Sequence, residues 1–372
     1  MTLYIGLMSG TSLDGVDGVL IDFASPAGPP ILLQAHHHQP FPAPLRSELL
    51  ALNTPGDNEL QRAELAANAI ACSYAEVVHT LLRGHPGAAR DVRAIGAHGQ
   101  TVRHRPGEFD GTGFTSQLLN GALLAELTGI DVVCDLRRRD VAAGGQGAPL
   151  APGLHAALFA LPGQSRVVLN LGGIANLSVL NADGSLLGFD CGPGNALLDG
   201  WCQRHRGQPF DHDGRWAASG RVVEPLLAAL LAEPFFGQQP PKSTGRDLFN
   251  LTWLDAYVAR HAPDFPAADV QATLAALTVH SAAQHARQHA IGAELLLACG
   301  GGAHNTHLMR ELTAQLPGVR VATTASVGLP VDQVEGAAFA WLAQRYVERL
   351  PGNIVSVTGA RGARVLGALY PA

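Results

Sequence analysis

The sequence has 372 residues, of which 47% are hydrophobic and 15% are charged, the composition of an ordinary globular protein. A chain of this length has room for two domains, because one core stops growing near about 250–300 residues. With a formal net charge of −6, the chain lacks the excess of positive charge that is typical of proteins that bind nucleic acid or anionic membranes. We expect no bilayer-spanning stretch of about 18 apolar residues and no secretory signal, and therefore a cytoplasmic protein.

The five cysteines are odd in number, widely scattered and free of any CxxC pair. This pattern predicts neither a disulfide framework nor a zinc site, and it fits reduced thiols in the cytoplasm.

The first half of the chain alternates predicted strands and helices. Apolar runs rich in Val, Ile and Leu predict strands at residues 3–8, 16–23, 30–38, 92–97 and 130–134. Helical periodicity predicts helices at residues 58–84, 114–128 and 151–160.

The same order then begins again. Strands are predicted at residues 166–173, in two short runs that follow, at 294–302 and at 319–324. Helices are predicted after the Gly-Pro-Gly at 192–194, and at residues 221–232, 268–289, 306–316 and 331–349. Three hairpin strands followed by strand–helix crossovers predict a mixed sheet with helices on its faces in each half, and a cleft between the halves.

The first predicted turn, in MSGTSLDGVD at residues 8–17, is full of Gly, Ser and Thr. Such a turn presents backbone N–H groups and hydroxyls, which suit phosphate oxygens, although no P-loop motif is present. Asp14 and Asp17 carry the kind of oxygen ligand that Mg²⁺ prefers. The alternative is a plain hairpin turn, because such turns favour the same residues for conformational reasons.

Two further glycine-rich turns occupy comparable places in the second half. NLGGIAN at 170–176 follows the first strand of that half, and CGGGAHN at 299–305 follows a later strand and begins a helix. The first would grip a polyphosphate, and the second would let a flat adenosine ring lie against backbone. A simple tight turn is the alternative for each.

Asp190 ends a predicted strand just before a helix, in FDCGPGN at 189–195. Strand ends of this kind often carry catalytic groups, whereas the alternative is an ordinary helix cap. The Gly-Pro-Gly between Asp190 and the helix makes capping awkward.

Two polar segments also follow predicted strands, AHGQT at 97–101 and DLRRRD at 135–140, which leads into AGGQGAP at 143–149. Neutral hydrogen-bonding groups beside an arginine suit a polyhydroxylated or carboxylated small molecule, although surface loops have similar composition. Within the His36–His38 run only two rings share a face, and no third metal ligand is evident.

Taken together, nine segments resemble the anhydro-N-acetylmuramic acid kinase family, nearly end to end and in order. They are residues 8–17, 96–106, 137–150, 169–178, 189–195, 240–250, 299–305, 331–343 and 357–362. The resemblance implies the fold of the sugar kinase/actin/Hsp70 superfamily: an α/β protein of two duplicated ribonuclease H-like domains with an interdomain cleft. We expect these domains at residues 1–160 and 161–352, with 353–372 returning to the first.

The resemblance also implies site residues. Contacts with ATP phosphates would come from Gly10, Thr11, Ser12, Leu13, Asp14, Gly15, Val16 and Asp17 on one side and from Asn170, Gly172 and Gly173 on the other. The nucleoside would lie beside Gly300, Gly301 and Gly302, Asp14 would hold Mg²⁺, and Asp190 falls on the catalytic aspartate. The sugar side would comprise His98, Gln100, Thr101, Arg139 and Glu335. Three positions depart from the family pattern, namely Leu136, Cys191 and Gly336.

The activity implied is ATP-dependent, Mg²⁺-assisted phosphorylation of 1,6-anhydro-N-acetylmuramic acid with hydrolytic opening of its bridge, by a homodimer. Two alternatives stay open. One is a plain sugar kinase acting on a free hydroxyl. The other is an actin- or Hsp70-like ATPase, against which stand the lack of an appended peptide-binding domain and the many polar residues at 96–106 and 137–150.

Overall fold

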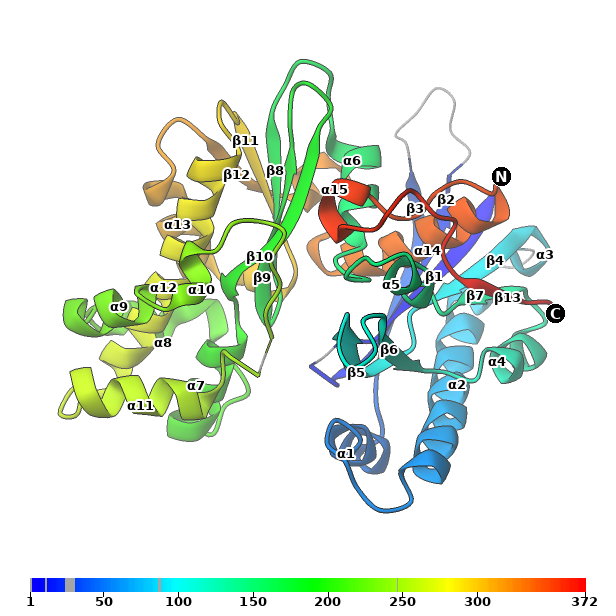
Figure 1. The fold of residues 1–372 in the computed structure, drawn as a ribbon, viewed down its shortest axis with the longest axis horizontal. Coiled ribbons are helices and arrows are strands. Elements are labelled where there is room, and N and C mark those ends of the chain that lie inside the picture. The colour runs from blue at the N-terminus through cyan, green and yellow to red at the C-terminus, as the bar shows by residue number, and fades with distance from the viewer. Residues whose placement is uncertain (1, 11, 24–30, 86–87, 246) are drawn as a thin grey trace. The chain divides into compact units, whose positions relative to one another are not determined.

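The computed structural model describes residues 2–10, 12–23, 31–85, 88–245 and 247–372, and divides into two compact units (Figure 1). The first unit comprises Met1–Leu158 together with Gln333–Ala372, and the second comprises Phe159–Asp332. Each unit is built around its own sheet, so the mixed α/β class predicted from the sequence is confirmed.

The first unit has a six-stranded sheet among its described residues, in the order β13-β7-β4-β1-β2-β3. The strands are β1 (Leu3–Met8), β2 (Gly15–Asp22), β3 (Leu32–Pro40), β4 (Val92–Ala97), β7 (Val132–Cys134) and β13 (Ala368–Tyr370). β1, β2 and β3 form an antiparallel meander, β4 and β7 run parallel to β1, and β13 closes the edge antiparallel to β7. A separate hairpin is formed by β5 (Gln100–Pro106) and β6 (Gly113–Leu118).

The helices of this unit come from both of its chain segments. They are α1 (Ala43–Ala51), α2 (Glu59–Arg83), α3 (Ala88–Asp91), α4 (Gly121–Thr128), α5 (Arg138–Ala142), α6 (Ala151–Phe159), α14 (Val334–Val347) and α15 (Val355–Thr358).

The two longest of these helices cover opposite faces of the sheet. Adjacent residues of a strand point to opposite faces, and a Cβ at Gly18 would meet Val77 of α2, whereas the Val19 methyl groups lie against Gly336 of α14. On the α14 side the contact is backbone to backbone. A Cβ at Gly6 would overlap the carbonyl of Gly336, and one at Gly96 would overlap the carbonyl of Phe339.

Helix α2 is long and apolar enough, by length and composition, to cross a membrane, which departs from the sequence expectation. Within its most apolar window, however, 56% of the residues are buried in the protein. The buried residues recur at helical spacing, as Ala66, Ile70, Tyr74, Val77 and Leu81. This is the pattern of a core helix that packs on β2 and β3.

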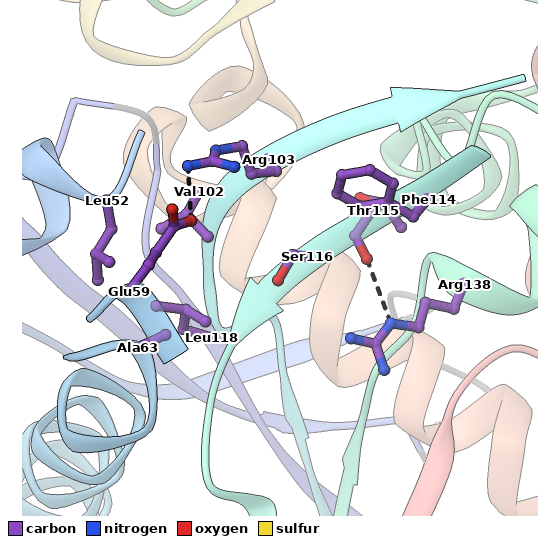
Figure 2. Close-up of a pocket in the computed structure, with 10 residues that line it drawn as sticks. All are labelled: Leu52, Glu59, Ala63, Val102, Arg103, Phe114, Thr115, Ser116, Leu118 and Arg138. Atoms are coloured by element: carbon purple, nitrogen blue, oxygen red, sulfur yellow. Dashed lines mark hydrogen bonds and ion pairs between the residues drawn. The ribbon is translucent and has the colours of Figure 1, made fainter. Parts of the chain in front are cut away.

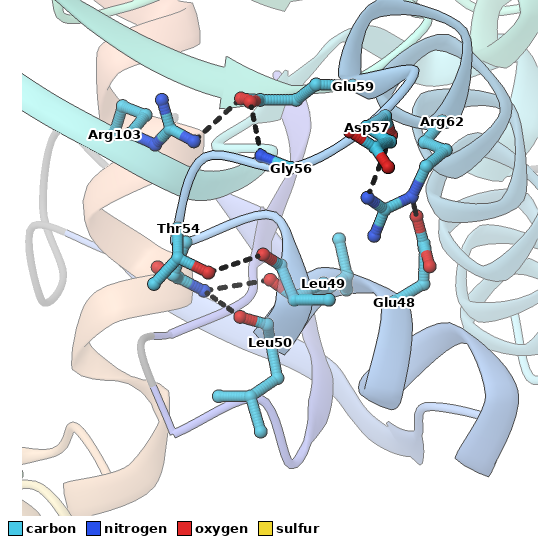
Figure 3. Close-up of polar contacts among 11 residues, drawn as sticks. Glu48, Leu49, Leu50, Thr54, Gly56, Asp57, Glu59, Arg62 and Arg103 are labelled. Carbon is cyan, nitrogen blue, oxygen red and sulfur yellow. Dashed lines mark hydrogen bonds and ion pairs between the residues drawn. The ribbon is translucent and has the colours of Figure 1, made fainter.

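The turn between α1 and α2 is fixed by charged side chains (Figure 3). The Arg62 Nε lies 2.6 Å from a carboxylate oxygen of Glu48, and Arg103 on β5 lies 2.7 Å from Glu59. Glu59 also accepts the Gly56 amide at 3.3 Å. The β5–β6 hairpin is thus tied to the start of α2.

The second unit has a five-stranded sheet among its described residues, in the order β10-β9-β8-β11-β12. Its strands are β8 (Arg166–Leu171), β9 (Ile174–Leu180), β10 (Leu186–Pro193), β11 (Leu295–Cys299) and β12 (Arg320–Thr323). β8, β9 and β10 form an antiparallel meander, and β11 and β12 run parallel to β8. Strand order and direction therefore match those of β1, β2, β3, β4 and β7 in the first unit.

The helices of this unit surround a central one. They are α7 (Ala196–Arg206), α8 (Arg215–Ser219), α9 (Glu224–Leu231), α10 (Pro234–Gly237), α11 (Leu251–His261), α12 (Ala267–His289) and α13 (Thr306–Gln315). Short 3₁₀-helices occur at His212–Gly214, Gly301–His304, Thr324–Val327 and Val331–Gln333. α12 is buried along most of its length and packs on β9 and β10, as well as on α7, α8, α9 and α13.

One expected domain boundary is wrong. The first boundary was expected after residue 160 and falls after 158, but the second falls after 332 and not after 352. The reason is that α14 packs on the first sheet, where the glycines of β1 and β4 allow a close approach. The expected cleft between the domains stays a prediction.

Most predicted elements are present, with one misassignment that matters for the site. Residues 114–128 were expected as a single helix, but 113–118 form β6 and only 121–128 are helical. The first part pairs with β5, a strand that the sequence did not predict. Asn120 separates the two by capping α4, since its side chain accepts the Leu123 amide at 3.0 Å.

The docking of α14 yields a stability prediction. Gly96→Ala should lower the free energy of unfolding by about 3 kcal/mol, because the added methyl group overlaps backbone that cannot turn away. Gly84→Ala is the matched control, since its Cβ would lie 3.7 Å from the nearest atom. Urea denaturation compares the two, and equal stabilities would contradict this account of the contact.

Candidate active site

The turn between β1 and β2 is held by hydrogen bonds to buried polar groups. The Ser9 hydroxyl lies 2.8 Å from the Tyr74 hydroxyl and donates to the Gly99 carbonyl at 3.1 Å. The Gln100 side chain donates to the Gly10 carbonyl at 3.0 Å. These bonds tie the turn to α2 and to the start of β5.

The same turn keeps backbone N–H groups available. Among the described residues, the amides of Gly10 and Ser12 donate no hydrogen bond. A Cβ at Gly10 would meet nothing closer than the Ser12 hydroxyl at 3.5 Å, so the fold does not require glycine there. A ligand that approaches the backbone closely would require it.

Other residues of the predicted phosphate motif serve the fold through their side chains. Leu13 and Val16 are buried in the core of the first unit. A Cβ at Gly15 would overlap the Gln39 carbonyl on β3. Asp17 lies 3.0 Å from His38 and 3.4 Å from His36 on the neighbouring strand. The predicted phosphate contacts thus narrow to the backbone around Gly10 and Ser12, and Thr11 lies outside the described residues.

Asp14 is exposed and partly engaged. One of its oxygens accepts the Ser12 hydroxyl at 2.8 Å and the Gly15 amide at 3.0 Å. Mg²⁺ usually keeps several waters and takes one or two carboxylates plus substrate phosphates. A single oriented carboxylate fits that requirement, and no cluster of three metal-binding side chains is found in the described part of the chain.

His98 is buried between the turn and an arginine. Its Nδ1 lies 3.1 Å from the Ser9 carbonyl, and its Nε2 accepts Arg137 at 3.1 and 2.9 Å. Burial and the Arg137 charge hold the pKa of His98 well below its usual value. The ring is therefore neutral with its proton on Nδ1, and neither nitrogen is left for a ligand, in contrast to the sugar contact that the sequence predicted.

Arg137 is the cation that the sequence analysis missed. It donates to the Gly147 carbonyl at 2.8 Å as well as to His98. Burial lowers its pKa to about 10, opposed by the charges of Glu335 and Asp140. The group is still charged at neutral pH. Glu335, at the start of α14, is thus the predicted sugar residue that the structure brings near an arginine.

Arg139, the arginine predicted beside the sugar, is exposed on α5. Its side chain makes no hydrogen bond or ion pair to the described residues. The signal that favours Arg137 is its place nearest the end of β7, where a side chain reaches the edge of the sheet.

Gln100 and Thr101 begin β5. Gln100 is fully buried, and its Oε1 has no hydrogen-bond partner within the described ranges. The Thr101 hydroxyl accepts the Gln117 side chain at 3.2 Å. Gln100 positions the turn, and Thr101 is the more accessible of the two.

In the second unit, the turn at Gly172 and Gly173 joins β8 to β9. The Gly172 carbonyl accepts the Asn195 amide at 2.8 Å, and the Gly173 carbonyl accepts the amides of Gly194 and Ala196 at 3.0 and 3.1 Å. Neither glycine's amide donates to a described residue. A Cβ would fit at both, with nearest atoms at 3.4 and 3.7 Å. As at Gly10, the fold leaves N–H groups and space that suit phosphate oxygens.

The turn at Gly300–Gly302 differs, since packing explains two of its glycines. Gly300 has φ +78°, and a Cβ there would overlap the Asn170 side chain. A Cβ at Gly302 would lie 2.6 Å from that of Leu171. Among these three glycines, only Gly301 has room for a Cβ, with the nearest atom at 3.9 Å. Asn170 therefore packs against this turn, and the predicted nucleoside contact narrows to Gly301.

Asp190 lies on β10 beside Asn176 of β9, at a bulge. Its carboxylate accepts the Thr244 amide at 2.9 Å, and its own amide donates to the Lys242 carbonyl at 3.2 Å. Burial raises the pKa of Asp190 to about 6, although the Thr244 amide and the Lys242 charge oppose the rise. The group is a carboxylate at neutral pH and is more basic than an exposed aspartate.

The departure at Cys191 has a structural account. The thiol is buried and donates to the Ala175 carbonyl at 3.3 Å, a bond that a hydroxyl would also make. Burial raises the pKa of this thiol, so it stays protonated.

The described residues also form pockets away from these groups. Figure 2 shows one of about 330 Å³ in the first unit, between α2 and the β5–β6 hairpin. Its arginines are engaged: Arg103 pairs with Glu59, and Arg138 donates to the Thr115 carbonyl at 3.3 Å. A second, of about 300 Å³, lies in the second unit between α8, α12 and α13. No predicted site residue lines either pocket.

Comparison with known proteins shows the family to which the chain belongs. The model of the family described as anhydro-N-acetylmuramic acid kinase matches residues 2–372. The chain belongs to this family. A protein of that name from Variovorax paradoxus is 60% identical over 375 residues, covering 100% of this chain and 99% of the relative. One from Cupriavidus metallidurans is 58% identical over 373 residues, covering 99% and 97%.

Among solved structures, the activator of 2-hydroxyisocaproyl-CoA dehydratase from Clostridium difficile with bound ADPNP is 12% identical. It covers 95% of this chain and 99% of its own, with a TM-score of 0.47. The family membership rests on the sequence relatives. On this basis the chain is an enzyme, a kinase of the anhydro-N-acetylmuramic acid kinase family.

The two arginines give a prediction. Arg137→Gln should lower kcat/KM for the sugar by about 10–100-fold, because a hydrogen bond to a charged group contributes about 1.5–3 kcal/mol. The KM for ATP should change little. Arg139→Ala should stay within about threefold of wild type, since its side chain has no described partner. Steady-state kinetics decides, and a large loss in the Arg139 variant alone would restore the assignment made from the sequence.

Proposed function

We propose that the protein transfers the γ-phosphoryl group of ATP to O6 of 1,6-anhydro-N-acetylmuramic acid while water opens the anhydro bridge. The product is N-acetylmuramic acid 6-phosphate, and the role is recycling of cell-wall sugar. The observation that carries this proposal is Asp190, a carboxylate held by the Thr244 amide, with its pKa raised to about 6.

The chemistry explains why a base is needed. In the anhydro sugar O6 is bonded to C1, so no hydroxyl is available for deprotonation. O6 gains its electron pair only as the C1–O6 bond breaks, and C1 must then accept a nucleophile. We propose that Asp190 removes a proton from water as that water adds to C1, which contributes roughly 10²–10⁴-fold in rate.

The two glycine turns would bind the phosphate chain. Free amides around Gly10 and at Gly172 and Gly173 support this role, since backbone N–H groups in a turn stabilise anionic oxygens. Developing charge on the transferred phosphoryl group would meet the same donors. Gly301 would lie against the nucleoside.

On the sugar side we assign Arg137, Glu335 and Thr101. Arg137 carries the positive charge that an N-acetylmuramic acid, with its carboxylate, would pair with. Mg²⁺, held by Asp14 with water and phosphate oxygens, would neutralise charge on the phosphates when bound.

The matched strand orders of the two sheets support the duplicated fold of the sugar kinase/actin/Hsp70 superfamily. The homodimer and the cytoplasmic location implied by the resemblance stay predictions.

The phosphate role is tested at Gly10. Gly10→Ala should weaken ATP binding about 10–100-fold, because the methyl group fits the folded chain yet blocks an anion from the amides. Calorimetry measures the affinity, and Gly84→Ala is again the control. Unchanged ATP affinity in a folded Gly10 variant would remove the turn from the nucleotide site.

The mechanism is tested at Asp190. Asp190→Asn should lose nearly all turnover and still bind ATP, because the amide keeps the shape but not the basicity. In wild type, kcat/KM for the sugar should fall as pH drops through about 6, where the carboxylate takes up a proton.

An isotope experiment separates the proposed reaction from a plain sugar kinase. In ¹⁸O-water, product quenched before anomeric exchange should carry label at C1 and none in the phosphate. Absence of label at C1 would favour phosphorylation of a free hydroxyl. ATP turnover independent of the sugar would favour an actin- or Hsp70-like ATPase.

A further inference from the structure

Lys242 is the only lysine among the 25 Lys and Arg residues of the chain. It is also buried, with 8% of its surface exposed. Arginine serves every other cationic position, so this position has a requirement that arginine does not meet. The surroundings of the ammonium group show what that requirement is.

The ammonium group has as many acceptors as it has protons. Nζ lies 3.0 Å from the Phe235 carbonyl, 3.4 Å from the Phe236 carbonyl and 2.8 Å from Nε2 of His285. It also lies 4.5 Å from the centre of the Phe235 ring. A lysine has three donors on a compact centre, whereas arginine spreads five donors over a plane. The site is therefore shaped for an ammonium ion.

The acceptors hold the charge without cancelling it. His285 is on α12, and its Nδ1 lies 2.7 Å from the Ser281 carbonyl, which places the proton on Nδ1 and leaves Nε2 as an acceptor. Burial lowers the pKa of His285, and the Lys242 charge acts in the same direction. A neutral imidazole and two carbonyl groups thus satisfy the ammonium ion and add no counter-charge.

The backbone of residues 242–244 holds Asp190 through two hydrogen bonds. The Lys242 carbonyl accepts the Asp190 amide at 3.2 Å, and two residues later the Thr244 amide donates to the Asp190 carboxylate at 2.9 Å. The side chain of Lys242 meanwhile fastens this segment to α10 and α12. The side chain that bonds to α10 and α12 and the backbone that bonds to Asp190 thus belong to the same three residues, 242–244.

We propose that Lys242 is a positioning residue for Asp190. Its ammonium group anchors residues 242–244, whose backbone orients the carboxylate, and its charge favours the ionised form of that carboxylate. This inference rests on the proposed role of Asp190 as the base. The other titratable groups facing this pair are Cys191 on β10 and His285 and His289 on α12, and the pKa shifts of these groups favour their neutral forms near neutral pH.

Electrostatic coupling between two charges is reciprocal, which allows a test without turnover. Protein labelled with [ζ-¹⁵N]lysine carries a single side-chain signal, because the chain has one lysine. The pKa of Lys242, read from that signal, should fall in Asp190→Asn relative to wild type, since loss of the Asp190 charge disfavours the ammonium form. An unchanged Lys242 titration would overturn the proposal, whether or not Asp190 is the base.

Kinetics supplies the second test. Lys242→Met should lower kcat about 10–100-fold with both KM values within about threefold, and should move the acid limb of kcat/KM for the sugar upward by about one pH unit. Lys242→Arg keeps the charge but not the shape, so its acid limb should stay near that of wild type while kcat falls. Because all variants use the same substrates, ionisation of ATP cancels in the comparison.

A purely structural lysine would give a different result. Lower thermal stability of Lys242→Met, with kcat per folded molecule and the pH profile unchanged, would overturn the proposal. Should Lys242→Met fail to fold, the labelled-lysine comparison still decides, because it needs no change at Lys242. An active Asp190→Asn enzyme would overturn the proposed function itself, and the titration of Lys242 distinguishes that failure from this one.

Discussion

The backbone contact between α14 and the first sheet is the constraint on which the first unit depends. Gly6 and Gly96 let the helix approach two neighbouring strands until carbonyl groups occupy the space of a side chain. That approach fixes the helix in register with the sheet. It brings Phe339 against the His98 ring at 4.8 Å and places Glu335 near Arg137. Two distant segments of the chain thus meet at one set of polar groups, and the unit boundary follows from the same contact.

The glycines of the three turns divide by what a methyl group would meet. At Gly15, Gly300 and Gly302 the protein itself fills the space, so packing accounts for the residue. At Gly10, Gly172, Gly173 and Gly301 a methyl group would make only ordinary van der Waals contacts. A glycine that the fold does not require costs conformational entropy, and a ligand close to the backbone is the compensation that these positions suggest. The structure thereby separates residues that sequence motifs treat alike.

Most strands, most helices and the place of Asp190 on a strand followed from the sequence, because apolar periodicity is a local signal. Other features depend on contacts that no local pattern encodes. Residues 114–118, Phe-Thr-Ser-Gln-Leu, have no local pattern that decides between helix and strand, and they form β6 by pairing with β5. Helix α14 belongs to the first unit because it packs on Gly6 and Gly96. These glycines lie more than 200 residues away in sequence, so no local pattern reveals the contact. Three consecutive arginines look alike in sequence, and the hydrogen bonds to His98 distinguish Arg137 from the other two. Lys242 lies in one of the segments that resemble the family, residues 240–250, but no role was assigned to it from the sequence.

The same arrangement of a cation, a histidine and a backbone carbonyl occurs in both units. In the first, Arg137 donates to Nε2 of His98, whose Nδ1 faces the Ser9 carbonyl. In the second, Lys242 donates to Nε2 of His285, whose Nδ1 faces the Ser281 carbonyl. A buried cation needs hydrogen-bond partners, and a carboxylate partner would neutralise its field. A neutral imidazole fixed by a carbonyl satisfies the donor and leaves the positive charge effective. In the second unit that charge acts on Asp190, and in the first the charges of Glu335 and Asp140 act on Arg137. In both units, therefore, a neutral histidine whose other nitrogen faces a backbone carbonyl satisfies a cation's hydrogen bonds without adding a counter-charge of its own.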